Sequence, residues 1–496
     1  MEVRCIGAFY LIIILALACE MSSAAQFKDS KRRTKGKGLR NICDVTDRDS
    51  NVHCYCENAK EMRNATKAEC WVFNGGIAKE DIVWPSFVSQ PSLQTLSFNV
   101  RVDGALDYVP TSALQYLQNL RSLSIKYGNI VEVGPFALAN LTNLTEVALT
   151  QSQIVTLHQY AFAHLPNLTT LNLEENTILE IGKDSFVDVP KLQKLILSKN
   201  NITEISNGAF QHTFNLLELD LNKNSIFHLD RHAFDGLANL RKLDLRKNRI
   251  YNLTEFTFTE LWNLQELLLG KNEIKYISAR AFDGLSQLQK LSLDDNKLAH
   301  IPPGLFEGVR GLKSLDLRSN ELHALTFDNI KPILDNLKPQ NSNLLLEGNN
   351  FVCNCQLKWI HLLRNETSSQ NIKDSLDGVT CKMDPPIASS AYNKMSDNIK
   401  MNTKLETVEI MKQDATNKKH IDDTKKGAKR NLLKIPPETL PCPEEKVETT
   451  EMPVLVDPVI PLQNEMKTYR LQEMSSARGT FVPSLLWSIT FIFFFT

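Results

Sequence analysis

A repeat of 24 residues runs through the middle of the chain and limits what it can fold into. Its first leucine returns at this spacing at Leu120, Leu144, Leu168, Leu192, Leu216, Leu240, Leu264, Leu288 and Leu312. A unit of this length that recurs at a fixed period is one supersecondary element, which cannot bury its apolar residues alone. Neighbouring units must therefore stack and share one continuous core. We expect a solenoid.

The order of residues inside each unit is LxxLxLxxNxL. One unit reads Leu192, Leu195, Leu197, Asn200 and Ile202. This is the leucine-rich-repeat signature, and weaker units at Leu93 and Leu344 bring the total to about eleven repeats. The predicted fold class is an α/β repeat, a curved solenoid with a parallel β-sheet on its concave face. Disulfide-bonded caps are expected at the N- and C-terminal ends, because an open end would expose apolar core to water.

Two other residue types recur with the same period. The phenylalanines, which we expect to stack as core, are Phe162, Phe186, Phe210, Phe234, Phe258, Phe282 and Phe306. The asparagines, whose amides can bond backbone groups where the chain leaves the strand, are Asn176, Asn200, Asn224, Asn248, Asn272, Asn296 and Asn320. Gly128 and Ser152 replace asparagine in the first two strict repeats, so looser bonding is expected there.

Both ends of the chain have the pattern of processing signals. Arg4 precedes an apolar run at residues 6–18, which is typical of a secretory signal rather than a buried core helix. The C-terminal tail ends in FIFFFT with no Lys or Arg behind it, and small residues precede it. This predicts a glycosylphosphatidylinositol (GPI) anchor attached at Ser475, on the extracellular face of the plasma membrane. A short transmembrane tail anchor is the alternative.

Cysteines and sequons agree with export. Eight of the ten cysteines form two groups of four, Cys43, Cys54, Cys56 and Cys70, then Cys353, Cys355, Cys381 and Cys442. Even sets in an exported chain indicate disulfides, and an oxidising compartment disfavours a zinc site at Cys353 and Cys355. The predicted N-glycosylation sites are Asn64, Asn140, Asn143, Asn167, Asn201, Asn252 and Asn365.

These features predict the domain organisation. The segments are a signal peptide 1–25, a basic tail 26–42, an N-terminal cysteine cap 43–90, repeats 91–352, a C-terminal cysteine cap 353–442 with a flexible charged insertion, a stalk 443–475 and a GPI-attachment propeptide 476–496.

No catalytic or cofactor motif is present in the sequence. It contains no GxSxG, HExxH, P-loop or Rossmann fingerprint, so we expect no enzyme, no metal site and no cofactor. A net charge of -1 predicts no nucleic-acid partner. The stretch from Lys28 to Arg40 is strongly basic and could contact sulfated glycans, or it is simply a solvated tail.

A partner would bind the variable positions 2, 3, 5, 7 and 8 of each repeat, which project from the strand and its edge. Candidate partner-binding residues at positions 7 and 8 are Lys199, Lys223, Lys247, Lys271, Glu174, Glu175, Asp294 and Asp295. Ile196 and Leu268, at position 5, are candidate exposed apolar anchors. A solvated charge column is the other interpretation.

Two copies of the chain could pair through this surface, since isologous dimers need self-complementary patches. We call Lys199, Lys223, Lys247 and Lys271 the lysine column, which is centred on residue 235. A two-fold axis at residue 235 would oppose Lys199 to Lys271 and Glu175 to Asp295. Like charges would meet. A staggered or lateral pairing, or a different acidic ligand, stays open.

The caps and the register carry a family resemblance. With Cys54-Tyr55-Cys56, the strict 24-residue period and the run from Cys353 to Trp359, the chain resembles connectin-like GPI-anchored leucine-rich-repeat cell-adhesion proteins. The resemblance implies homophilic adhesion between cells, such as target recognition between motor axons and muscle. By similarity to extracellular caps, it also implies the pairs Cys43 with Cys56, Cys54 with Cys70, Cys353 with Cys381 and Cys355 with Cys442.

A second hypothesis belongs to a different class. The chain could be a GPI-anchored co-receptor that binds a soluble or heterologous protein through its concave face, with the lysine column as the docking strip. An enzyme or enzyme inhibitor ranks far below, because no residue constellation supports it.

Overall fold

A computed structural model describes residues 40–45, 50–57, 64–383 and 429–442. The predicted signal peptide, the stalk, the propeptide, Ser475 and most of the basic tail and of the charged insertion lie outside these residues. Among the described residues, no helix combines the length and the apolar content needed to cross a membrane.

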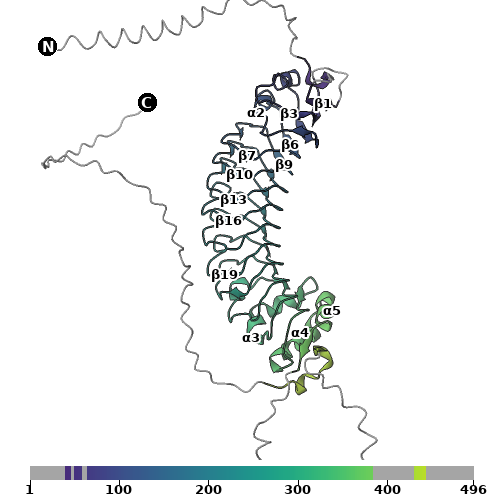
Figure 1. Cartoon of the computed structure of the whole chain (residues 1–496). Coiled ribbons are helices and arrows are strands. Elements are labelled where there is room, and N and C mark those ends of the chain that lie inside the picture. Colours follow the sequence, from purple (N-terminus) through teal and green to yellow (C-terminus); the bar gives the residue numbers. More distant parts are fainter. Residues whose placement is uncertain (1–39, 46–49, 58–63, 384–428, 443–496) are drawn as a thin grey trace, which may run out of the picture. The chain divides into compact units, whose positions relative to one another are not determined.

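One long sheet runs the length of the repeats (Figure 1). Its 13 strands, in spatial order, are β1 (Val52–Cys56), β2 (Lys67–Val72), β4 (Thr95–Val100), β6 (Ser122–Lys126), β9 (Glu146–Thr150), β12 (Thr170–Asn172), β15 (Lys194–Ile196), β17 (Glu218–Asp220), β18 (Lys242–Asp244), β20 (Glu266–Leu268), β22 (Lys290–Ser292), β23 (Ser314–Asp316) and β24 (Asn343–Leu345). Strand β1 is antiparallel to β2, and the strands from β2 onward are parallel. The predicted fold class, a parallel-strand solenoid, is confirmed.

The register of the sheet follows from the period of the sequence. Leu195 pairs with Leu171 on one side and Leu219 on the other, each 24 residues away. Because successive side chains of a strand point to opposite faces, this register places every leucine of the consensus in the core. All nine first leucines are at most 1% exposed.

Short two-residue strands line the opposite side of the repeats. Their sheets are β7 (Glu132–Val133) with β10 (Thr156–Leu157), then β8 (Leu138–Ala139), β11 (Phe162–Ala163) and β14 (Phe186–Val187), then β13 (Glu180–Ile181) with β16 (Glu204–Ile205), and β19 (Asn252–Leu253) with β21 (Tyr276–Ile277). The seven phenylalanines of the repeat are buried on this side, at most 1% exposed. Three neighbouring pairs of these rings stack, with centroids 5.9 Å apart for Phe234 and Phe258.

The asparagine column joins each repeat to its neighbour, as predicted. Asn200 Nδ2 donates to the carbonyl oxygens of Leu197 in its own repeat and Leu173 in the previous one, at 3.0 and 2.9 Å. Its Oδ1 accepts from the backbone amide of Ile178 at 3.1 Å. Ser152 takes over part of this role earlier in the chain, because its Oγ accepts from the amide of Gly128 at 3.3 Å.

The N-terminal cap closes the first end of the core. Strand β2 continues the long sheet, β1 is added to it, and β3 (Gly75–Gly76) pairs with β5 (Gly104–Ala105) behind them. Disulfides Cys43–Cys56 and Cys54–Cys70 fix the hairpin. Beneath it, Trp84 and Phe87 are fully buried beside α2 (Thr111–Leu114). The apolar cross-section of the first repeat is therefore covered.

The C-terminal cap contains the longest helices of the described chain. They are α4 (Lys358–Glu366) and α5 (Gln370–Asp377), which follow α3 (Phe327–Ile330) and precede the antiparallel pair β25 (Thr380–Lys382) and β26 (Lys429–Asn431). Trp359 is buried, and its Nε1 donates to the carbonyl of Leu325 at 2.7 Å. Disulfides Cys353–Cys381 and Cys355–Cys442 close this cap. All four bridges are the pairs that the family resemblance implies.

Candidate protein-recognition surface

The outward side of the long sheet carries the variable residues of the repeats, and we call it the sheet face. In β18, Leu243 points into the core while Lys242 lies on the sheet face. Positions 7 and 8 follow each strand and extend this face along one edge. None of the five sequons inside the strict repeats falls in a strand of the long sheet.

Position 8 has a left-handed backbone in all nine strict repeats. Positive φ values, between 51° and 62°, occur at Tyr127, Gln151, Glu175, Lys199, Lys223, Lys247, Lys271, Asp295 and Ser319. The turn brings the asparagine at position 9 back into the core. Glycine is the residue that this conformation favours, and Gly348 fills it in the last repeat. The backbone conformation of position 8 therefore does not explain why lysine occupies it in four repeats.

The ends of the lysine column are neutralised by acids. Lys199 Nζ lies 3.1 Å from a carboxylate oxygen of Glu174 and also pairs with Glu175. The hydrogen bond from Lys199 lowers the pKa of Glu175 and raises the pKa of Lys199. At the other end, Lys271 lies 3.8 Å from Asp295. These pairs are intramolecular, so they reduce the charge that the column offers to a partner.

Cations without an ion pair in the described part of the chain gather at the middle of the sheet face, where Lys242 lies between Glu218 and Glu266 in the strand register. We call Lys223, Arg241, Lys242 and Lys247 the basic centre; three of them belong to the single repeat that begins at Leu240. Within the described residues, none of the four has a carboxylate partner within ion-pair distance, whereas Arg246 is bonded to Asp244 at 2.9 and 3.1 Å. The basic centre can therefore attract an acidic group without first breaking an ion pair.

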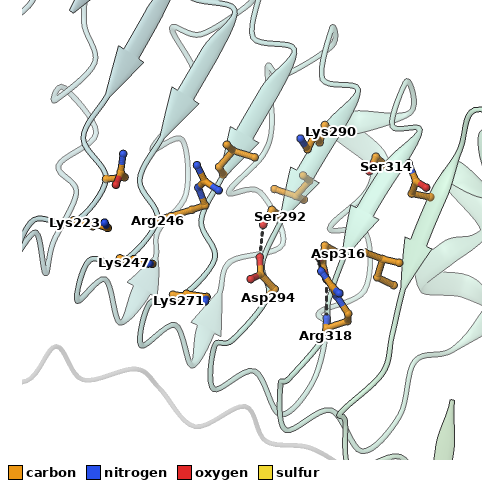
Figure 2. A pocket seen from close by; sticks show the side chains of 15 residues that line it. Lys223, Arg246, Lys247, Lys271, Lys290, Ser292, Asp294, Ser314, Asp316 and Arg318 are labelled. Atoms are coloured by element: carbon orange, nitrogen blue, oxygen red, sulfur yellow. Dashed lines mark hydrogen bonds and ion pairs between the residues drawn. The ribbon is translucent and has the colours of Figure 1, made fainter. Parts of the chain in front are cut away.

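A groove of about 540 Å³ opens beside the basic centre. Figure 2 shows Lys223, Lys247 and Lys271 in a row along one edge and Lys290 and Ser314 toward the other. Leu268, in the groove lining, is only 5% exposed. At Gly270 a Cβ atom would stand 2.2 Å from the Asp294 carboxylate. Glycine at this position therefore gives the Asp294 side chain the space that it occupies.

Two acids at position 5 of the sheet face differ in their partners, and one of them, Asp316, lines the groove. Asp316 accepts bonds from Arg318 at 3.0 and 2.7 Å. Asp220 has no ion pair among the described residues and accepts from the backbone amide of Asn222 at 3.0 Å. Burial raises the pKa of Asp220, while the bonds from Asn222 lower it and the charge of Asp244 raises it further.

The structure corrects one predicted apolar anchor. Leu268 was expected to be exposed, but it is only 5% exposed and lines the groove together with residues of the neighbouring repeats. Ile196 is half-buried and remains accessible. Asp294 forms no ion pair with the lysine column among the described residues; its carboxylate accepts a hydrogen bond from Ser292 Oγ instead.

The predicted glycosylation sites lie outside the strands of the long sheet. Asn64, Asn140, Asn143, Asn201 and Asn365 are exposed, and Asn167 and Asn252 are half-buried. Arg40, the last residue of the predicted glycan-binding stretch, is exposed, whereas residues 28–39 lie outside the described chain.

Two residues of the basic centre are absent from the sequence-based candidates. Arg241 and Lys242 occupy positions 2 and 3 of the repeat, and the candidates were drawn from positions 7 and 8. Counting charge over all five outward positions of each repeat would have found them. Among the described residues, no group of three or more His, Cys, Asp or Glu side chains is placed to hold a metal ion.

Comparisons with known proteins agree with this architecture. The model of the leucine rich repeat family matches residues 118–178, 142–202, 190–250, 238–298 and 286–331. Connectin from Drosophila melanogaster is 39% identical over 92 residues, which are 18% of this chain and 14% of connectin. The alignment thus spans about one seventh of that relative.

Solved structures share the repeat architecture at lower similarity. The protein in the TLR13–ssRNA13 complex is 27% identical with a TM-score of 0.48, over 56% of this chain and 41% of that one. The Drosophila Toll–Spatzle complex gives 22% identity and a TM-score of 0.48, over 60% and 47%. Neither likeness carries a functional conclusion. The repeat matches and the solenoid together show leucine-rich repeats over residues 118–331, and the chain is similar to connectin over the 92 aligned residues.

Proposed function

We propose that the chain is a cell-surface adhesion and recognition protein that binds a protein partner through its sheet face. The observation that carries the proposal is the basic centre, four cations without carboxylate partners among the described residues, beside a groove of about 540 Å³. Charges that face water without intramolecular partners contribute little to folding. They can steer and hold an acidic partner.

Other features support placement at a cell surface. Four disulfides are typical of an oxidising compartment, and the tail pattern at residues 476–496 is that of a GPI signal with attachment at Ser475. The similarity to connectin, a cell-adhesion protein, supports an adhesion role. We extend the proposal to homophilic contact between apposed cells, including target recognition between motor axons and muscle.

A co-receptor for a heterologous protein is the second candidate. In a direct two-fold pairing of sheet faces about residue 235, Lys223 would oppose Lys247. Both are exposed and lack ion pairs among the described residues, so they would repel each other, whereas the neutralised ends would not. Homophilic pairing therefore needs a stagger or another surface. An acidic heterologous ligand needs neither.

A cell-aggregation experiment separates the two candidates. Non-adhesive cells that express the full chain are mixed with labelled cells that lack it. Homophilic adhesion predicts clusters made only of expressing cells. Mixed clusters would instead indicate a heterologous partner on the labelled cells, and the absence of any cluster would reject adhesion in favour of a soluble ligand.

A further inference from the structure

A stripe of exposed apolar side chains follows position 12 of the repeats, outside the sheet face. Val131, Leu179, Phe227 and Tyr251 are 58%, 49%, 50% and 49% exposed, and Val155 between them is half-buried. We call these five residues the apolar stripe. Tyr276, one position further in its repeat, extends it and is 65% exposed.

The core of the solenoid does not need these residues. The core residues of this segment are at positions 11 and 14 of the repeat, which flank position 12. In the repeat that contains Phe227 they are Ile226 and Leu229, which are 0% and 3% exposed. Position 12 can therefore be polar at no loss of packing, and it is Thr203 in one repeat and Lys275 in another. Apolar residues in several repeats at one dispensable position form a patch that requires an explanation.

Backbone hydrogen bonds join neighbouring position-12 residues from Val131 to Thr203, and Tyr251 to the next repeat. The amide of Val155 donates to Val131 at 2.8 Å, that of Leu179 to Val155 at 3.3 Å, and that of Thr203 to Leu179 at 3.0 Å. Tyr251 accepts in the same way from Lys275 at 2.9 Å. Successive members are thus about 5 Å apart, the spacing of neighbouring strands.

Two glycosylation sequons lie within this stripe. Asn201-Ile202-Thr203 contributes Thr203 itself, which is the one polar residue at position 12 between Val131 and Tyr251. Asn201 is exposed. The second sequon begins at Asn252, directly after Tyr251, and Asn252 pairs with Tyr276 between β19 and β21.

The position of Asn201 decides between possible occupants of the stripe. Asn201 is exposed and lies two residues before Thr203, the position-12 residue between Leu179 and Phe227. A sugar attached there would hinder a second copy or a flat protein surface from lying along the stripe. A sugar, however, can cover the stripe itself. Pyranose rings present C–H groups on one side, and these groups suit the negative faces of aromatic rings.

We propose that the N-glycans of Asn201 and Asn252 cover the apolar stripe and keep the chain soluble and unassociated on that side. Glycans at these sites are bulky and solubilising. They leave the sheet face as the surface open to a partner. The proposal shares only secretory export with the proposed function, and it does not depend on which protein the sheet face binds.

Hydroxyl-radical footprinting of the full chain tests the proposal. Protein made in animal cells is labelled before and after enzymatic removal of N-glycans, and oxidation is measured for each peptide by mass spectrometry. We expect oxidation of Phe227 and Tyr251 to rise severalfold, to the rate of Trp262. Trp262 is the matched control because it is 55% exposed and lies outside the stripe and its sequons.

Variants give an independent readout. Asn201→Gln removes one acceptor without touching its backbone bond to Ile178, and we expect it to increase the oxidation of Phe227. Asn143→Gln removes an exposed sequon elsewhere and should leave Phe227 unchanged.

Three results would overturn the proposal. If the peptide map shows Asn201 and Asn252 without glycans, no sugar is present to cover the apolar stripe. Oxidation of Phe227 at the Trp262 rate with sugars present would show that sugars do not shield it. Protection that persists after the sugars are removed would identify a protein, such as a second copy, as the occupant. None of these results bears on cell aggregation through the sheet face.

Discussion

The side chain of Asn224 accepts a hydrogen bond from the backbone amide of Ile202, in the preceding repeat, at 3.0 Å. Its Nδ2 donates to the carbonyls of Leu197 and Leu221 at 3.0 and 2.9 Å. One buried amide therefore satisfies three backbone groups and connects two repeats.

Replacing Asn224 with alanine should destabilise the chain by about 3 kcal/mol, because each buried polar group left without a partner costs about 1–3 kcal/mol. The free energy of unfolding in denaturant measures the effect. Asn239→Ala is the control, since Asn239 is exposed and makes one bond, to Phe214. Its cost should stay within about 0.5 kcal/mol. Equal losses for both variants would contradict a structural role of the asparagine column.

The ring of Phe258 stacks between two others, with its centroid 5.9 Å from that of Phe234 and 6.3 Å from that of Phe282. It is fully buried. Truncation to alanine should lower the free energy of unfolding by about 3–5 kcal/mol, the usual effect of a large aromatic lost from a core. Trp262, in the same repeat, is 55% exposed, so Trp262→Ala should change stability by less than about 0.5 kcal/mol. A small effect at Phe258 would mean that the core relaxes around the cavity.

The fold could be predicted from the sequence because nine leucine anchors spaced exactly 24 residues apart leave little freedom. The leucines, the phenylalanines and the asparagines each occupy a fixed position of the repeat. Stacking of the repeats then fixes the strand register, as for Leu195 between Leu171 and Leu219. The bonds of Ser152 were less predictable. Its hydroxyl reaches Gly128 because both residues depart from the consensus in neighbouring repeats.

The recognition surface was only partly predictable. The period places Lys199, Lys223, Lys247 and Lys271 in one column, but it cannot tell which lysines are neutralised by which acids. That depends on side-chain reach, which joins Lys199 to Glu174 and Glu175 and leaves Lys223 without an ion pair among the described residues. The burial of Leu268 likewise could not be read from its outward position in the repeat.

Asp220 should make stability depend on pH. Burial raises its pKa in the folded chain, so the folded state holds the proton more tightly than the unfolded state does. The stabilisation from this proton is complete at low pH and is lost as pH rises through the folded pKa. At neutral pH, Asp220→Asn should therefore unfold at a higher denaturant concentration than the unmodified chain. The difference between the two should vanish in acid.

Asp316→Asn serves as the control for Asp220→Asn in the same denaturation series. Its carboxylate accepts two bonds from Arg318, so the neutral variant should lose stability at neutral pH rather than gain it. A gain in both variants would show that general charge reduction, not burial of Asp220, is responsible.

The predicted anchor gives a direct biochemical test. If Ser475 carries a GPI anchor, phosphatidylinositol-specific phospholipase C should release the full extracellular chain from intact cells into the medium. A version in which a transmembrane helix replaces residues 476–496 should stay on the cells after the same treatment. Retention of the unmodified chain after complete digestion of other GPI proteins would reject the anchor and favour a transmembrane tail.

Reversing the charge of the basic centre should weaken recognition. Lys223 and Lys247 have no ion pair among the described residues, so Lys223→Glu with Lys247→Glu removes attraction for an acidic partner and adds repulsion. At about 1 kcal/mol per lysine, partner binding should fall roughly thirtyfold, and cell aggregation should fall with it. Arg231→Glu makes the same kind of change in an exposed turn away from the sheet face and should leave aggregation intact.

Lys199→Glu distinguishes the basic centre from the lysine column as a whole. Lys199 is already paired with Glu174 and Glu175, so its reversal mainly disrupts an intramolecular contact and should reduce aggregation far less than the double reversal does. High salt should weaken binding of the unmodified chain because exposed charges are screened. Equal aggregation by the double variant and the unmodified chain, measured at the same surface expression, would show that the basic centre is only a solvated charge cluster.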